Sequence, residues 1–140
     1  MKRLLVVDDN LAVRDFLSAA ISAVGCAVET ASSADEALGR MREQPPDAVL
    51  VSVEMADDDG WAFVRAYQAQ MRAQVPIGVM ASTKREAAIA ARVLGVEAHL
   101  RKPFGLSSLL GALELLLQVA PPQLLRIPIP AHSGRSRRAG

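Results

Sequence analysis

The chain has 140 residues, of which 51% are hydrophobic and 22% are charged, so it can bury one core but is too short for two ordinary domains. Its one cysteine, Cys26, excludes an intramolecular disulfide, and no apolar run approaches the roughly 18 residues of a membrane span. Because no signal-like segment precedes Lys2, we expect a cytoplasmic chain with Cys26 in its core and no membrane partner.

The first half of the chain predicts three strands and two helices. Four apolar residues, 4–7, follow Arg3, and this run favours a strand over residues 3–7 that is buried on both faces. Asn10 can cap a helix that Gly25 ends, and residues 26–30 predict a second strand. Ser33 with Glu36 forms a capping-box pattern that begins a helix to about residue 42. Two prolines end that helix, and residues 49–53 predict the third strand.

The second half continues the alternation. Residues 57–60, three aspartates and a glycine, predict a loop before a helix that contains residues 61–71. A strand is predicted over 76–80, a helix over 84–93 closed by Gly95, a strand over 96–100 and a helix from about 106 to 119. Five strands that alternate with five helices through short loops indicate parallel pairing. The predicted fold is therefore α/β, a doubly wound five-stranded parallel sheet covered on both faces.

The tail, residues 120–140, differs in composition from the body of the chain. Its four prolines exclude a continuous helix, and its charged residues are four arginines with no acid. The body is left with 12 basic residues against 15 acidic ones, so it is mildly acidic while the tail is basic.

The candidate site residues, most of them polar, lie at the carboxyl ends of the predicted strands. Asp8 and Asp9 follow the first strand, Ser52 lies at the end of the third, Ala81 follows the fourth and Lys102 follows the fifth. In open parallel sheets the ligand crevice lies outside these ends. Each residue alone is an ordinary polar strand end, but the set on one edge predicts a functional site.

Several motifs carry a resemblance to a known family. They are Val6-Val7-Asp8-Asp9-Asn10, Pro46-Asp47 before an apolar strand, Met55 followed by Asp59-Gly60-Trp61, Pro76, and Leu100-Arg101-Lys102-Pro103-Phe104. With them, residues 1 to about 119 resemble the receiver domain of bacterial two-component response regulators, which has a flavodoxin-like fold. The resemblance implies a Mg²⁺ site formed by Asp8, Asp9 and the backbone carbonyl of Glu54. It also implies that Lys102 binds a phosphoryl group and that positions 81 and 99 are the two switch positions.

The sequence departs from the family pattern where phosphorylation would occur. Counting from Gly60 puts Ser52 at the position of the phosphoacceptor aspartate, and Ala81 and His99 occupy the switch positions. A one-residue slip would instead place Ser82 at the first of these. A serine hydroxyl is neutral and needs a base to become a nucleophile, so we expect conventional phosphorylation to fail. One carboxylate fewer should also weaken Mg²⁺ binding and leave Lys102 paired with the remaining acids.

We therefore predict a stand-alone, atypical receiver domain that is not an enzyme and acts through protein contacts. Its partner would be a histidine kinase or another signalling regulator, which would dock near Arg92, His99 and Arg101. A homodimer is a further alternative. The competing hypothesis is an active phosphoacceptor that uses Ser52 or a displaced acid such as Asp57. A weaker alternative is nucleic-acid binding through the arginines of the tail.

Overall fold

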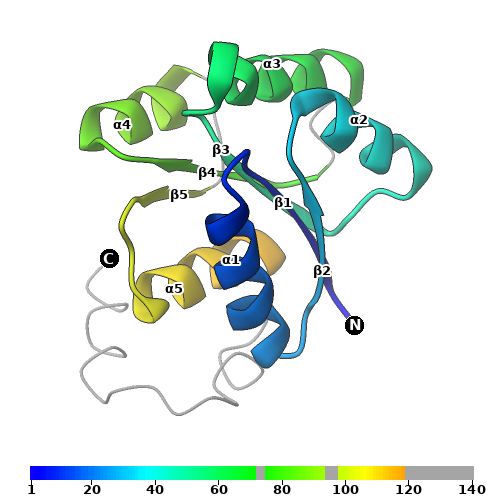
Figure 1. The fold of residues 1–140 in the computed structure, drawn as a ribbon, viewed down its shortest axis with the longest axis vertical. Helices are drawn as coiled ribbons and strands as arrows, with labels where there is room; N and C mark the ends of the chain where they lie inside the picture. Colours follow the sequence, from blue (N-terminus) through cyan, green and yellow to red (C-terminus); the bar gives the residue numbers. More distant parts are fainter. Residues whose placement is uncertain (72–74, 94–97, 119–140) are drawn as a thin grey trace.

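A computed structural model of the protein describes residues 1–71, 75–93 and 98–118 (Figure 1). Five parallel strands form one sheet in the order β2-β1-β3-β4-β5. The strands are β1 (Arg3–Val7), β2 (Ala27–Ala31), β3 (Ala48–Ser52), β4 (Ile77–Ala81) and β5 (Ala98–Arg101). The chain moves from β1 outward to β2 and then back across to β3, so the strand order reverses between β1 and β3. The predicted doubly wound parallel sheet is confirmed.

Helices cover both faces of the sheet (Figure 1). They are α1 (Leu11–Ala23), α2 (Ala34–Glu43), α3 (Asp59–Met71), α4 (Lys84–Val93) and α5 (Leu106–Leu117). Helices α1 and α5 pack on one face, where their buried side chains share a cluster with Leu50 and Met80. Helices α2, α3 and α4 pack on the other face, around Val49 and Val51. No helix in these described ranges is long and apolar enough to cross a membrane.

Strand β3 is the centre of both hydrophobic clusters. All five of its residues are buried, and successive side chains contribute to opposite faces of the sheet. Because β3 lies between β1 and β4, its last residue, Ser52, stands in the middle of the carboxyl edge of the sheet. The packing of the central strand therefore sets where any chemistry at position 52 can occur.

Most element boundaries agree with the sequence patterns to within two residues. Strand β2 begins one residue later than predicted because the turn after α1 continues to Cys26, whose N–H bonds to the carbonyl of Ile21. Cys26 is buried, as expected, and burial raises the pKa of its thiol. The predicted helix end at Gly95, the first part of the predicted fifth strand and the tail 120–140 lie outside the described residues.

The predicted loop over residues 57–60 is wrong in its second half. A 3-10 turn covers Ala56–Asp58, with Asp57 in a left-handed conformation (φ 58°), and α3 already begins at Asp59. An acidic residue is favourable in the first turn of a helix, which explains why the aspartate run leads directly into one. Gly60 permits this early start, because a Cβ atom there would lie 1.9 Å from the carbonyl oxygen of Ser52.

Candidate functional site

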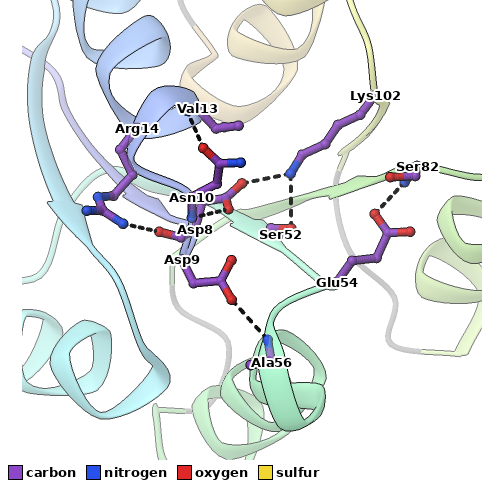
Figure 2. A network of polar contacts seen from close by, with 10 residues as sticks. All are labelled: Asp8, Asp9, Asn10, Val13, Arg14, Ser52, Glu54, Ala56, Ser82 and Lys102. Carbon is purple, nitrogen blue, oxygen red and sulfur yellow. Dashed lines mark hydrogen bonds and ion pairs between the residues drawn. The ribbon is translucent and has the colours of Figure 1, made fainter.

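Three of the predicted site residues meet at the carboxyl edge of the sheet (Figure 2). The Nζ atom of Lys102 lies 2.7 Å from Oδ2 of Asp8 and 3.2 Å from Oγ of Ser52. Asp8 and Ser52 are each only 1% exposed, whereas the Lys102 side chain is 22% exposed. The predicted ion pair between Lys102 and one of the two acids is thus present, and the acid is Asp8.

Asp8 has a second hydrogen-bond donor besides Lys102. Its Oδ1 atom accepts a bond from the backbone N–H of Asn10 at 3.0 Å, and its backbone carbonyl accepts one from the Arg14 guanidinium at 2.7 Å. Asn10 in turn caps α1, because its Oδ1 accepts from the N–H of Val13 at 3.2 Å. The start of α1 therefore holds Asp8 in place, and the buried carboxylate has both a counter-charge and a second donor.

The other two predicted metal-site residues bond elsewhere. Oδ2 of Asp9 accepts from the N–H of Ala56 at 3.0 Å, and Oε1 of Glu54 accepts from the N–H of Ser82 at 2.6 Å (Figure 2). Carboxylates are the ligands that Mg²⁺ prefers, but the charge of Asp8 is already compensated by Lys102. Within residues 1–71, 75–93 and 98–118, no group of three acidic, histidine or cysteine side chains could hold a metal ion. Both acids of the predicted metal site therefore accept hydrogen bonds from protein donors in this structure.

The two predicted switch positions differ in burial. Ala81 is the last residue of β4 and is fully buried, and its carbonyl accepts a bond from the N–H of Lys102 at 2.7 Å. Ser82 lies beyond the strand and is exposed, so the strand register places alanine, not serine, at the strand end. His99 is exposed on β5, opposite Val79 of β4.

The predicted partner residues lie on one side of the sheet. Arg101 is opposite Ala81 in the register, so it shares with His99 the sheet face on which α4 packs. Both side chains are exposed, as is that of Arg92 on α4. Lys84 and Arg85, in the first turn of α4, are exposed too. Helix α4 and strand β5 therefore present several cationic side chains to solvent, together with the apolar Ile89.

Sequence reasoning missed three carboxylate contacts of this edge, including the bond between Asp9 and the N–H of Ala56 described above. Only the backbone carbonyl of Glu54 was assigned a role, and the bond of its carboxylate to the N–H of Ser82 was not predicted. Asp59, assigned to a loop, accepts a 2.5 Å bond from the N–H of Ala34 and so joins the starts of α3 and α2. We refer to Asp8, Asp9, Glu54 and Asp59 as the carboxylate belt. These four side chains connect segments that follow different strands, at the edge where those strands end.

A cavity of about 530 Å³ opens beside this site. Its lining is largely apolar, from Ala12, Val13, Phe16, Pro103 and Phe104, and also includes three polar residues of the edge, Asn10, Ser82 and Lys102. Phe16, on α1, is 51% exposed. The cavity gives solvent and ligands a path to Lys102.

Comparison with known proteins gives a family-level match. The response regulator receiver domain family matches residues 4–114. Response regulator MprA of Mycolicibacterium vanbaalenii is 38% identical over 127 residues, which cover 86% of this chain and 52% of that protein. MprA of Mycobacterium avium is 37% identical over 128 residues, with 86% and 53% covered. The chain thus spans about half the length of these curated relatives.

Solved structures share the fold. The chemotaxis protein CheY4 of Vibrio cholerae superimposes with a TM-score of 0.75 at 30% identity, covering 84% of this chain and 99% of that one. A receiver domain protein from Clostridium thermocellum, at 23% identity, superimposes with a TM-score of 0.76 and covers 84% and 95%.

Proposed function

Because the chain belongs to the response regulator receiver family, we propose that it is an atypical receiver domain of two-component signalling that acts by protein contact, without phosphorylation of an aspartate. The observation that carries the proposal is the environment of Ser52. This residue occupies the centre of the carboxyl edge, it is 1% exposed, and its hydroxyl accepts a hydrogen bond from Lys102.

The surroundings of Ser52 disfavour phosphoryl transfer to its hydroxyl. A serine needs a neighbouring base to remove its proton during attack. The carboxylate closest in the hydrogen-bond network, Asp8, is already bonded to Lys102 and Asn10. The hydroxyl therefore faces the ammonium group of Lys102 and not a free base. This contact supports a structural role for Ser52 over a role as a nucleophile.

Intact mass spectrometry after treatment with acetyl phosphate and Mg²⁺ tests this proposal. We expect no mass gain in the wild-type chain, while a receiver domain that retains its acceptor aspartate gains one phosphoryl group under the same conditions. A stable gain mapped to Ser52, or to the exposed Asp57, would support the competing hypothesis of an active phosphoacceptor.

The metal requirement can be tested with the same chain. We expect weak Mg²⁺ binding in the wild type and tighter binding in Ser52→Asp, because the substitution supplies a further carboxylate. Any cation that binds the folded state raises the denaturation midpoint, so Mg²⁺ should stabilise Ser52→Asp more than the wild type. Equal stabilisation of both proteins would contradict this account of the metal site.

For the partner, we propose another signalling protein, such as a histidine kinase or a second regulator, that binds on the side of α4 and β5. Arg92, His99 and Arg101 are exposed there, and the charge of the two arginines suits an acidic contact surface. Replacing both arginines by alanine should weaken such a complex and reduce its salt dependence. Binding that instead disappears when residues 121–140 are deleted would favour a role for the basic tail, and sedimentation would reveal a homodimer.

A further inference from the structure

Glu54 makes a contact that the receiver pattern alone does not suggest. It lies just after β3, and its Oε1 atom accepts a 2.6 Å hydrogen bond from the N–H of Ser82, which follows β4 (Figure 2). The two residues are 28 positions apart in the chain. The contact therefore joins the loops that leave two neighbouring strands.

Ser82 lies two residues before α4. The next residue, Thr83, caps that helix through two bonds: its Oγ1 accepts from the N–H of Glu86 at 3.0 Å, and its carbonyl accepts from the N–H of Ala87 at 3.2 Å. Ala87 is buried against the sheet. Because Thr83 directly follows Ser82 in the chain, a contact that holds the backbone of Ser82 also restricts Thr83, which caps the first turn of α4.

The sheet's own hydrogen bonds reach only to the end of β4. The N–H of Val53 bonds to Met80, and the N–H of Lys102 bonds to Ala81. Glu54 extends this connection one step further, to the N–H of Ser82. With alanine at position 81, the strand end itself offers no side-chain hydroxyl, so the polar link from β3 to this junction comes from the Glu54 carboxylate.

The charge of Glu54 suits this position. A hydrogen bond from a backbone N–H to a carboxylate is shorter and stronger than one between neutral groups. A negative group is also favourable in front of a helix N-terminus, and α4 begins two residues beyond Ser82. Ser82 and Lys102 line the same cavity, and both are already bonded internally, to Glu54 and Asp8 respectively.

We propose that Glu54 is an internal anionic ligand of the junction between β4 and α4. Its carboxylate holds the N–H of Ser82, fixes the first turn of α4, and so keeps the exposed surface around Arg92 in one conformation without phosphorylation. The role of this contact in presenting a partner-binding surface rests on the proposed function. The contact itself and its effect on the first turn of α4 do not depend on that function.

Amide hydrogen exchange measured by NMR tests the proposal on the full chain. The variants are Glu54→Ala, Glu54→Gln, which keeps an acceptor oxygen without the charge, and Glu43→Ala as a matched control. Glu43 is an exposed glutamate at the end of α2. Circular dichroism confirms that each variant is folded, and Glu54 is itself exposed, so its replacement leaves the core intact.

We expect the Ser82 amide to exchange about tenfold faster in Glu54→Ala, with Glu54→Gln intermediate and Glu43→Ala within about twofold of the wild type. The amides of Glu86 and Ala87 should also exchange several-fold faster in Glu54→Ala. An unchanged Ser82 amide would overturn the proposal. Faster exchange at Ser82 alone, with the first turn of α4 unaffected, would overturn it as well, because the contact would then be purely local.

This experiment is independent of the phosphorylation assay. A phosphoryl gain in the wild type would refute the proposed function and leave the exchange rates as they are. Unchanged exchange in Glu54→Ala would refute the internal ligand and leave the chemistry of Ser52 as it is.

Discussion

Replacing Lys102 by methionine keeps a long side chain at this position and removes the ammonium that faces Asp8. In the wild type, Nζ of Lys102 lies 2.7 Å from a carboxylate whose side chain is 2% exposed. After the substitution, the Asp8 charge remains buried with only the N–H of Asn10 as a partner in the contacts described above. The variant therefore measures the cost of leaving this buried carboxylate without its counter-charge.

The size of the effect follows from the burial of the two partners. Removing one member of a fully buried pair costs about 3–5 kcal/mol. Water reaches the partly exposed lysine, and Asp8 keeps one hydrogen bond, so we expect the lower value of about 2–3 kcal/mol for Lys102→Met. For a domain of this size, that loss lowers the melting temperature by about 6–12 °C.

Urea denaturation followed by the fluorescence of Trp61 measures this loss, because Trp61, on α3, packs against the core. The exposed Lys2 supplies the matched control, and Lys2→Met should stay within about 0.5 kcal/mol of the wild type. Ser52→Ala, which removes one acceptor of Lys102, should cost about 0.5–1.5 kcal/mol.

A double-mutant cycle completes the test. Adding Asp8→Asn to Lys102→Met removes the uncompensated charge, so the double variant should be more stable than the sum of the two single losses predicts. If Lys102→Met proved neutral while Ser52→Ala was severely destabilising, the reasoning would be refuted and Ser52 would be the residue on which the edge depends.

Two further predictions concern other parts of the fold. Gly60→Ala should destabilise by more than about 3 kcal/mol, because its Cβ would overlap the backbone of β3, whereas Gly111→Ala, with nothing within 4 Å of the added atom, should gain up to about 1 kcal/mol of helix propensity. Urea midpoints of the two variants decide this, and a similar loss in both would contradict it. The backbone N–H of Ser32, with smaller contributions from its hydroxyl and from Arg40, lowers the pKa of Glu36. A lowered folded-state pKa means that this stabilisation is present above the ordinary value of 4.5 and is lost as pH falls through the folded-state pKa. Glu36→Gln should therefore lose less stability on acidification than the wild type does; an unchanged pH profile of the urea midpoint would contradict this.

The convergence of Asp8, Ser52 and Lys102 could be predicted from the sequence because it follows from the parallel direction of the strands. Once the strands are parallel and alternate with helices, residues that follow them must share one edge. The alternation of side chains along β4 also assigned Ala81, and not Ser82, to the buried strand end. A shift by one residue would turn every apolar side chain of β4 to the other face of the sheet.

The contacts of the other three carboxylates of the belt, Asp9, Glu54 and Asp59, were harder to predict because these acceptors meet backbone donors. Glu54 bonds to an amide 28 residues away and Asp59 to one 25 residues away. Every residue except proline carries such a donor, so no residue type in the sequence marks the partner. The aspartate run posed a related problem, because acids favour both loops and first turns of helices, and only the close packing of Gly60 on β3 decides between them.

The sharing of one ammonium by Asp8 and Ser52 limits which residues position 52 can hold. An aspartate in place of Ser52 would put two carboxylates against one lysine at a position that is 1% exposed. Without a cation, their repulsion and the loss of hydration oppose that step. The single ammonium of Lys102 therefore suffices for the one buried carboxylate present at this edge, and a second carboxylate at position 52 would need a further positive charge, such as a bound cation.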